Sequence, residues 1–394
     1  MKRVKLQTFD IKFINHASLF ISDEKNKFLT DPWYISPAFG GWVQNPFPIY
    51  NDVEEIIKNK NKLNTIISHG HDDHLDDFFI KNYLNNSQII ISKFKSKGLY
   101  RRVKNISINE PIEVSQGIEN GYNINDIKIY SFINEFTGNV NDSIILITNK
   151  DEVVVHANDN YQELPRKVVE QIKLISKDKF LYYFAQVGIA NSFPIAFPDY
   201  SYHEKMKIIN DQIKVFIESF EKNINSIKPN LAFTYANQSK FHYYNKIVPY
   251  ENVIEQIDKH SFIKQLYPGD KILNRTLIRN KTDKINILDE FLKRAENECN
   301  KFVKSKIETS FKISFLVEKS DQILKPKSNN IFLVADVLTW LNILSGKLNL
   351  ETIIIGGVGK VIKLHEESMR EVARCLSEFA YVYQNKFTKS YFNS

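Results

Sequence analysis

Cysteine is scarce in this chain, with Cys299 and Cys375 as the two cysteines among 394 residues. They could form one disulfide at most and neither stands in a Cys-x-x-Cys pair, which argues against a cysteine-ligated zinc or iron–sulfur centre. Low cysteine usage is typical of a reducing compartment. Long apolar runs and a signal-peptide core are also missing. We therefore expect a cytoplasmic protein without a membrane partner.

Segregated charge is missing as well. The formal net charge is +7, but the lysines alternate with acidic residues instead of forming a long basic block. Because no recognisable nucleic-acid motif accompanies this charge, we expect no nucleic-acid partner. Hydrophobic residues make up 43% of the chain. This content and length allow one large α/β domain with an appendage, or two domains.

Histidine is infrequent too, at nine residues, yet three of the nine fall in the stretch 69–74, which reads His-Gly-His-Asp-Asp-His. His69, His71 and His74 offer nitrogen donors, and Asp73 offers an oxygen donor that can hold a second metal. On an extended or tightly turned segment, His69 and His71 project to one side, and the following turn brings Asp73 and His74 back towards them. A histidine-rich turn without function is the alternative. The pattern favours a metal site.

Hydrophobic periodicity predicts strands around this stretch. Residues 4–30 alternate polar and apolar side chains, as consecutive antiparallel strands do. The histidines follow a predicted strand at its C-terminal end. The other predicted elements are strands at 63–68, 88–92, 126–133, 143–148, 152–156, 231–235, 309–317 and 353–355, and helices at 52–60, 162–180, 203–226, 286–304 and 334–343.

The histidine stretch, on a strand-to-helix turn after antiparallel strands, resembles the His-x-His-x-Asp-His signature of the metallo-β-lactamase superfamily. That resemblance implies an αββα sandwich with a dinuclear metal site. We therefore predict an α/β (α+β) chain, with a metallo-β-lactamase-fold catalytic domain over 1–255. A smaller C-terminal α/β domain over 256–394 is interpreted as a helper domain.

The superfamily pattern next requires a ligand after a later strand, a bridging aspartate and a last histidine. Asp159 suits the bridging position, with a turn-capping aspartate as the alternative. His242 suits the last position, with a surface histidine as the alternative. No histidine lies between His74 and His156. Glu135 stands where the missing ligand should be, and a plain loop residue is its alternative.

A carboxylate oxygen is a harder ligand, in the hard–soft sense, than an imidazole nitrogen. Its presence moves the preference of the site from zinc towards iron or manganese. We predict two metal ions, with iron favoured and zinc or manganese as alternatives. Asp73 and Asp159 are predicted to be the catalytic ligands. His156 competes with Asp159 as a ligand, but its place within a strand favours a supporting role.

Further segments resemble one branch of the superfamily, the CMP-N-acetylneuraminate hydroxylases. They occur in order over roughly residues 10–250 and include 12–17, 30–33, 68–75 and 141–145. The resemblance implies a carboxylate at position 135 and places His16 and Asp31 near the metal pocket, where we favour support of the ligands over ligation. Vertebrate-type members carry a Rieske domain, whose Cys-x-His and Cys-x-x-His pairs this chain lacks. An oxygenase reaction here would take electrons from a separate protein.

Three functions fit these observations. The carboxylate-rich ligand set and the hydroxylase resemblance favour a di-iron oxygenase acting on a small polar or anionic molecule, with nucleotide sugars among the candidates. The alternative is a hydrolase of a phosphoester, amide or lactone, since a dinuclear site lowers the pKa of bound water. A non-catalytic binding protein is the third reading, and the nearly complete ligand set makes it the weakest.

Overall fold

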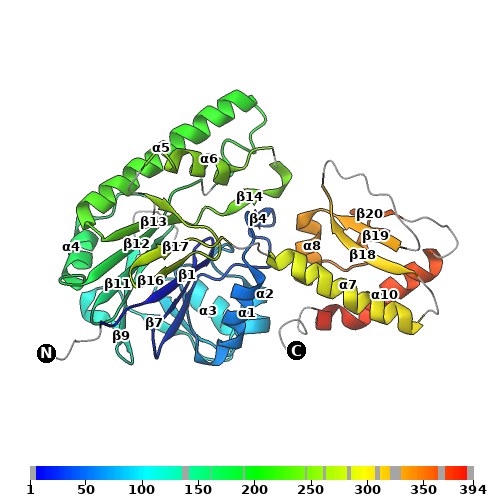
Figure 1. The fold of residues 1–394 in the computed structure, drawn as a ribbon, viewed down its shortest axis with the longest axis horizontal. Coiled ribbons are helices and arrows are strands. Elements are labelled where there is room, and N and C mark those ends of the chain that lie inside the picture. Colours follow the sequence, from blue (N-terminus) through cyan, green and yellow to red (C-terminus); the bar gives the residue numbers. More distant parts are fainter. Residues whose placement is uncertain are drawn as a thin grey trace. The chain divides into compact units, whose positions relative to one another are not determined.

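The computed structural model describes residues 6–134, 142–160, 162–189, 191–244, 246–260, 263–281, 285–306, 311–319, 330–362 and 369–387. The chain divides into two compact units (Figure 1), one of residues 1–34 and 44–283 and the other of 35–43 and 284–394. The predicted boundary at 255/256 falls inside helix α6 (Pro249–Ile257). The first unit continues past this helix because β16 (Lys271–Leu273) and β17 (Thr276–Ile278) extend one of its sheets.

The first sheet of this unit has eight strands in the order β17-β16-β1-β2-β3-β5-β6-β7. Its antiparallel part consists of β17, β16, β1 (Asp10–Asn15), β2 (Ser18–Ser22) and β3 (Lys27–Thr30). Its parallel part continues with β5 (Asn64–Ile67), β6 (Gln88–Ser92) and β7 (Ile112–Val114). The alternation in residues 4–30 therefore predicted the antiparallel strands correctly.

The second sheet has seven strands in the order β15-β13-β12-β11-β10-β9-β8. Its strands are β8 (Tyr122–Ile124), β9 (Ile127–Asn134), β10 (Asp142–Thr148), β11 (Glu152–Asn158), β12 (Phe180–Gln186), β13 (Leu231–Tyr235) and β15 (Lys264–Gln265). The helix predicted over 162–180 is too long: α4 (Arg166–Ile175) ends earlier, and the unpredicted strand β12 begins at Phe180. The continuous apolar run at 180–185, which is rich in aromatic residues, is typical of a strand buried on both faces, which shows no alternation.

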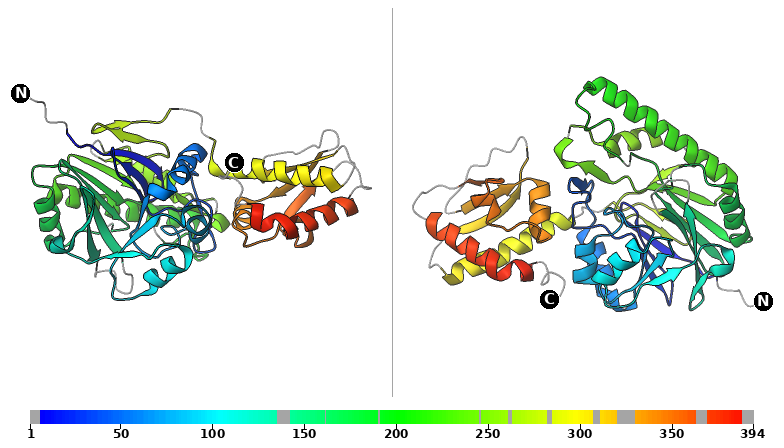
Figure 2. Two further views of the ribbon diagram at one scale, coloured as in Figure 1. Left: turned by 90° about the horizontal axis from the view of Figure 1, so that it is seen from below. Right: turned by 180° about the vertical axis from the view of Figure 1, so that it is seen from behind.

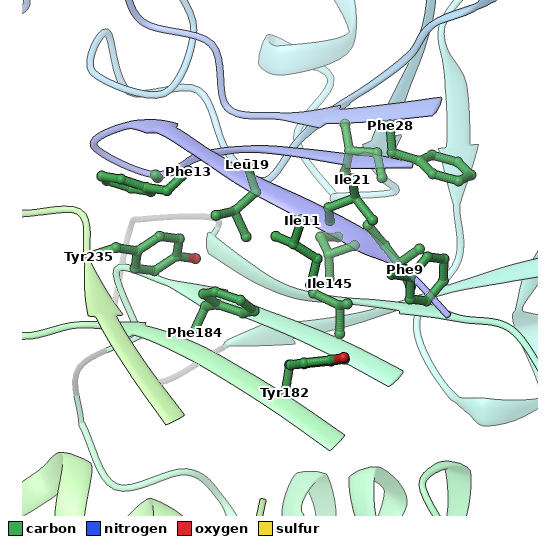
Figure 3. Packing of buried hydrophobic residues seen from close by; sticks show 14 of the residues in the cluster. Phe9, Ile11, Phe13, Leu19, Ile21, Phe28, Ile145, Tyr182, Phe184 and Tyr235 are labelled. Carbon is green, nitrogen blue, oxygen red and sulfur yellow. The ribbon is translucent and has the colours of Figure 1, made fainter. Parts of the chain in front are cut away.

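The two sheets face each other across one hydrophobic core. Figure 3 shows Phe13 and Leu19 of the first sheet directed towards Phe184 and Tyr235 of the second, and all four belong to one buried cluster. Burying a large apolar side chain contributes about 1.5–3 kcal/mol relative to leaving it exposed. This shared core joins the sheets into the inner layers of a sandwich.

Helices cover the outer faces of both sheets (Figures 1 and 2). On the first sheet, Val103 of α3 (Gly98–Ile106) packs in a cluster with Ile89 and Ile91 of β6. On the second sheet, Phe220 of α5 (Tyr202–Ile227) contacts Tyr183 of β12, with ring centroids 5.5 Å apart. The predicted αββα sandwich is therefore confirmed. The chain also contains α1 (Tyr50–Lys58), α2 (Asp77–Phe79), β4 (Trp42–Gln44) and β14 (Ser239–Phe241).

The second unit contains a three-stranded sheet of β18 (Lys312–Val317), β19 (Asn330–Ala335) and β20 (Gly359–Ile362). Its helices are α7 (Ile287–Lys306), α8 (Val337–Leu344), α9 (Thr352–Ile355) and α10 (Met369–Phe387). The prediction of a smaller α/β part is confirmed, but the predicted strand at 353–355 is wrong. That segment is helix α9, in which Gly356 N donates to Thr352 O at 2.9 Å. Its β-branched residues favour strands only weakly, and local propensity yields to tertiary packing.

Within the described parts of the chain, no helix combines the length and the apolar composition needed to span a bilayer.

Candidate metal centre

The candidate site lies at one end of the sandwich, where strands of both sheets stop. Four non-glycine residues at these strand ends have positive φ angles: His16 (49°), Asp31 (36°), Asn158 (40°) and Ala236 (55°). Such backbone conformations cost energy and cluster at functional sites. Ala236 N also donates to His16 O at 2.9 Å, which joins the two sheets at this point.

Six side chains bring metal-donor atoms together here, in two groups whose donor atoms lie within 4.8 Å of one another. The inner group consists of His16, Asp73 and His74, and the outer group of His69, His71 and Asp159. Each group contains two imidazoles and one carboxylate. The strand-end turn after β5 supplies four of the six, as the spacing of the histidine stretch predicted.

The inner group is fully buried. His16 Nε2 lies 3.2 Å from Asp73 Oδ2, and His74 Nε2 lies 3.8 Å from the same oxygen. His16 arrives from the turn after β1, so this group combines the N-terminal strands with the histidine stretch. The predicted supporting role of His16 stays a prediction, and the structure places this residue in the inner group with its Nε2 facing Asp73.

The outer group is more open, since His71 and Asp159 are half-buried. His69 Nε2 lies 2.9 Å from His71 Nδ1 and 3.8 Å from Asp159 Oδ2. The other oxygen of Asp159, Oδ1, lies 3.1 Å from His74 Nε2 of the inner group. Asp159 therefore offers one oxygen to each group, which is the arrangement of a bridging carboxylate.

The donor atoms are better arranged for binding metal ions than for hydrogen bonds among themselves. His74 Nε2, Asp73 Oδ1 and Asp159 Oδ1 are buried without a hydrogen bond. An unpaired buried polar atom costs about 1–3 kcal/mol. With metal–ligand bonds of about 2.0–2.2 Å, two donors on one ion lie roughly 3 Å apart, close to the distance between His74 and Asp159. A bound cation would supply the missing interaction for all three atoms.

Asp31 orients His74 from outside the donor groups. Its Oδ2 accepts from His74 Nδ1 at 3.0 Å and from Ser68 Oγ at 2.6 Å, and its Oδ1 accepts from Ser68 N at 2.7 Å. Because Nδ1 of His74 donates to Asp31, Nε2 is the nitrogen that faces the site. Burial alone would raise the pKa of Asp31, but the nearby His156 and His74 hold it well below its usual range.

His156 continues this network away from the donors. Its Nε2 donates to Asp31 Oδ2 at 2.8 Å, and its Nδ1 lies 2.5 Å from the Tyr235 hydroxyl. That hydroxyl accepts from Asn158 N at 3.1 Å, so its own proton points to His156 Nδ1. Burial raises the pKa of Tyr235 well above its usual value, which keeps the hydroxyl protonated. His156 therefore contacts Asp31 and Tyr235.

Two residues that sequence analysis did not assign hold His69. Its Nδ1 lies 3.0 Å from Ser68 Oγ and 3.4 Å from Asp142 Oδ1. Since Ser68 Oγ donates to Asp31, it accepts from His69 Nδ1, which leaves Nε2 of His69 for the site. Burial, with Asp159 nearby, raises the pKa of Asp142 well above its usual value. Ser68 directly precedes the histidines, but a short polar residue there equally suits a turn.

The electrostatics of the donors depend on the carboxylates. Burial would lower the pKa of His74, but Asp159 and Asp73 raise it well above its usual value. Burial lowers the pKa of His69 to about 3, and His74 acts in the same direction. An imidazole that binds a metal must be neutral. His69 therefore already has the protonation state of a ligand, whereas a cation would replace the proton on His74.

One predicted ligand, His242, does not join these groups. His242 is half-buried at the start of the short 3-10 helix His242–Tyr244 and belongs to neither donor group. The prediction relied on its position after β13, but β14 (Ser239–Phe241) lies between β13 and His242. Glu135 lies outside the described residues, so its role as a ligand stays a prediction.

None of the known protein-family models matches this sequence, and none of the curated proteins does. Among solved structures, the chain is similar to CmlA, a diiron β-hydroxylase from Streptomyces venezuelae, with 15% identity over 70% of this chain and 55% of that chain and a TM-score of 0.44. It is similar to a metallo hydrolase from Ignicoccus hospitalis, with 12% identity over 69% of this chain and 99% of that chain and a TM-score of 0.42.

A third similar structure is the metallo-β-lactamase fold protein YhfI from Bacillus subtilis, with 9% identity over 67% of this chain and 98% of that chain and a TM-score of 0.42. Structural neighbours of this chain thus include metallo-β-lactamase fold proteins, a hydroxylase and hydrolases. The chain spans about half the length of the hydroxylase, 55%. Identities and TM-scores this low transfer no activity to this chain.

Proposed function

We propose that the first unit is a dinuclear metal-dependent enzyme and that it acts as a di-iron oxygenase on a small polar or anionic substrate. The observation that carries this proposal is the composition of the two donor groups. Each offers two histidines and one aspartate. Two histidines and one carboxylate, with open positions beside them, are the ligand set of many non-haem iron oxygenases.

In this proposal, His16, Asp73 and His74 hold one ion, and His69, His71 and Asp159 hold the other. When bound, iron supplies the dioxygen chemistry, which protein side chains cannot supply. The protein contributes orientation. Asp31 keeps the proton of His74 on Nδ1, and Ser68 does the same for His69. We further propose Glu135 as an additional carboxylate ligand.

A hydroxylation of this type consumes external electrons. One oxygen atom enters the substrate, the other leaves as water, and the balance requires two electrons and two protons for each dioxygen. The chain lacks the cysteine–histidine pairs of a Rieske cluster. We therefore propose that a separate electron-transfer protein supplies the electrons.

A hydrolase is the second candidate, and the position of Asp159 favours it. Its two oxygens lie 3.1 Å from His74 Nε2 and 3.8 Å from His69 Nε2, so one carboxylate spans both groups. Paired metals bridged in this way also serve hydrolysis, in which they stabilise the attacking and leaving oxygens. The substrates would be phosphoesters, amides or lactones.

One preparation separates the two functions. The protein would be produced in iron-supplemented cells, its metals quantified, and oxygen uptake measured with a chemical reductant and a panel of small anionic substrates. We expect two iron ions per chain and substrate-dependent oxygen uptake. Zinc alone, together with hydrolysis and no oxygen uptake, would establish the hydrolase instead. For Glu135, substitution by alanine should lower the metal content, and an unchanged stoichiometry would remove it from the ligand set.

A further inference from the structure

One arginine outside the donor groups contacts the histidine stretch at several points. Arg102 lies on α3, the helix that follows β6, and its side chain is 28% exposed. Its Nε donates to both carboxylate oxygens of Asp77, at 2.9 and 3.0 Å. Its Nη1 donates to Gly70 O at 2.6 Å. Neither Asp77 nor Gly70 contributes a side chain to the donor groups.

The remaining nitrogen of Arg102 completes the contact. Nη2 donates to Asp72 Oδ1 at 2.9 Å and to Leu75 O at 3.2 Å. Gly70 lies between the ligands His69 and His71, and Leu75 follows the ligand His74. One planar guanidinium thus ties together both ends of the segment that carries four of the six donor side chains.

The two adjacent aspartates of the stretch have opposite surroundings. Asp73 is buried and faces the donor groups, where its Oδ2 lies 3.2 Å from His16 Nε2. Asp72 is 45% exposed at its side chain and pairs with Arg102. The first acidic residue of the histidine stretch, Asp72, therefore holds the turn in place from outside, while the second, Asp73, faces the site.

The charges in this contact are too exposed for strong ion pairs. The Asp72 and Asp77 side chains are each 45% exposed, and exposed pairs add little stability. Geometry matters more, because guanidinium is a rigid fork with five donors that can bind two carboxylates and two carbonyls at once. A lysine ammonium carries the same charge but cannot span these acceptors.

We propose that Arg102 is a positioning residue of the metal centre. By fixing the spacing between Gly70 and Leu75, it holds His69, His71, Asp73 and His74 where their donor atoms converge. It thereby slows the release of the metal ions. This inference rests on the proposed dinuclear site but not on the reaction performed there.

The test compares Arg102→Ala and Arg102→Lys with Arg101→Ala, an exposed neighbour on the same helix. Each full-length variant is loaded with Mn²⁺, whose affinity is read by electron paramagnetic resonance and whose release is followed after addition of a chelator. Loss of a residue that supports ligands costs about ten-fold or more in metal affinity. We expect about a ten-fold loss for Arg102→Ala, a smaller loss for Arg102→Lys and none for Arg101→Ala.

Two further readouts separate positioning from a general structural role. Guanidinium ion at low millimolar concentration should partly restore Mn²⁺ retention in Arg102→Ala and leave the other proteins unchanged. The melting temperature of the metal-free variant should match that of the metal-free wild type. The inference is overturned if Arg102→Ala binds and releases Mn²⁺ as the wild type does. It is equally overturned if weaker binding comes with a lower metal-free melting temperature and no rescue.

Failure of this inference is distinguishable from failure of the proposed function. If the wild type holds two ions but neither consumes oxygen nor hydrolyses any substrate, the proposed reaction fails while the assignment of Arg102 stands. If the wild type binds no metal, the site and the role of Arg102 are both refuted.

Discussion

The inner and outer donor groups have the same composition and different surroundings. Each has two histidines and one aspartate, but the inner group is buried throughout, whereas His71 and Asp159 of the outer group are half-buried. Buried charges are costly unless they are paired or bind a metal. The inner group therefore depends more on its ion, and the outer group has the open side that a substrate needs.

Because of this difference in burial, the two donor groups would bind their metal ions in different ways, although their ligands are chemically similar. An ion in the inner group would exchange slowly, because the side chains around it exclude water. An ion in the outer group would exchange faster and lie nearer to the substrate. Asp159 couples the two groups, since it contributes an oxygen to each of them.

The largest effect is expected when the contact between the inner and the outer donor group is removed. His74→Ala removes the Nε2 that lies 3.1 Å from Asp159 Oδ1 and 3.8 Å from Asp73 Oδ2. The two carboxylates then lack the imidazole between them. We expect both ions to be lost, measured as metal per chain after gel filtration. The matched control is His242→Ala, since His242 belongs to neither donor group. If His242→Ala loses as much metal as His74→Ala, the assignment of ligands to the two donor groups is wrong.

Removing one ligand from each group should separate the ions. His16→Ala acts on the inner group and His71→Ala on the outer group. We expect chelator-driven release from the wild type to show a fast and a slow phase. His16→Ala should abolish the slow phase and His71→Ala the fast one, each with the loss of one ion per chain. Loss of the same phase in both variants would mean that burial does not distinguish the groups.

A smaller effect is expected when Asp31 becomes neutral. In Asp31→Asn, the amide cannot accept from Ser68, His74 and His156 as the carboxylate does. Residues that orient a ligand in this way contribute about 10–100-fold in metal affinity. We expect a loss in this range, larger for the inner ion, in a metal titration followed by calorimetry. Equal weakening of both ions would show that Asp31 does not act through His74.

The smallest effect is expected at the far end of the same network. Tyr235→Phe removes the hydroxyl proton that points to His156 Nδ1. His156 reaches His74 only through Asp31, which contacts both histidines. One hydrogen bond contributes about 1 kcal/mol, so the inner ion should bind no more than about five-fold more weakly. The measurement is the same titration, with Tyr183→Phe on neighbouring β12 as the control. An effect as large as that of Asp31→Asn would contradict this order.

Sequence analysis predicted the sandwich because alternation and periodicity are local properties. The strands in 4–30 and the strand before His69 followed directly from them. The misplaced elements, β12 and α9, lie where the local signal is ambiguous, since aromatic or β-branched runs suit either a buried strand or a buried helix segment. Tertiary packing decided both.

The candidate site divides in the same way. Spacing alone grouped His69, His71, Asp73 and His74, because a turn of six residues leaves these side chains little freedom to separate. The role of Ser68 and of Asp142 could not be predicted, since a serine or aspartate beside a strand end has many common uses. Only distances across the fold show which ligand each one holds.

The sequence by itself determined that this chain carries a histidine-rich turn after a strand, because that pattern depends on neighbours along the chain. Only the tertiary structure decided that His16, 57 residues before Asp73, comes within 3.2 Å of it, and that His242 does not join either group. The physical reason is that the ends of strands far apart in sequence meet at one edge of the sandwich. Which of their side chains converge depends on sheet order and register.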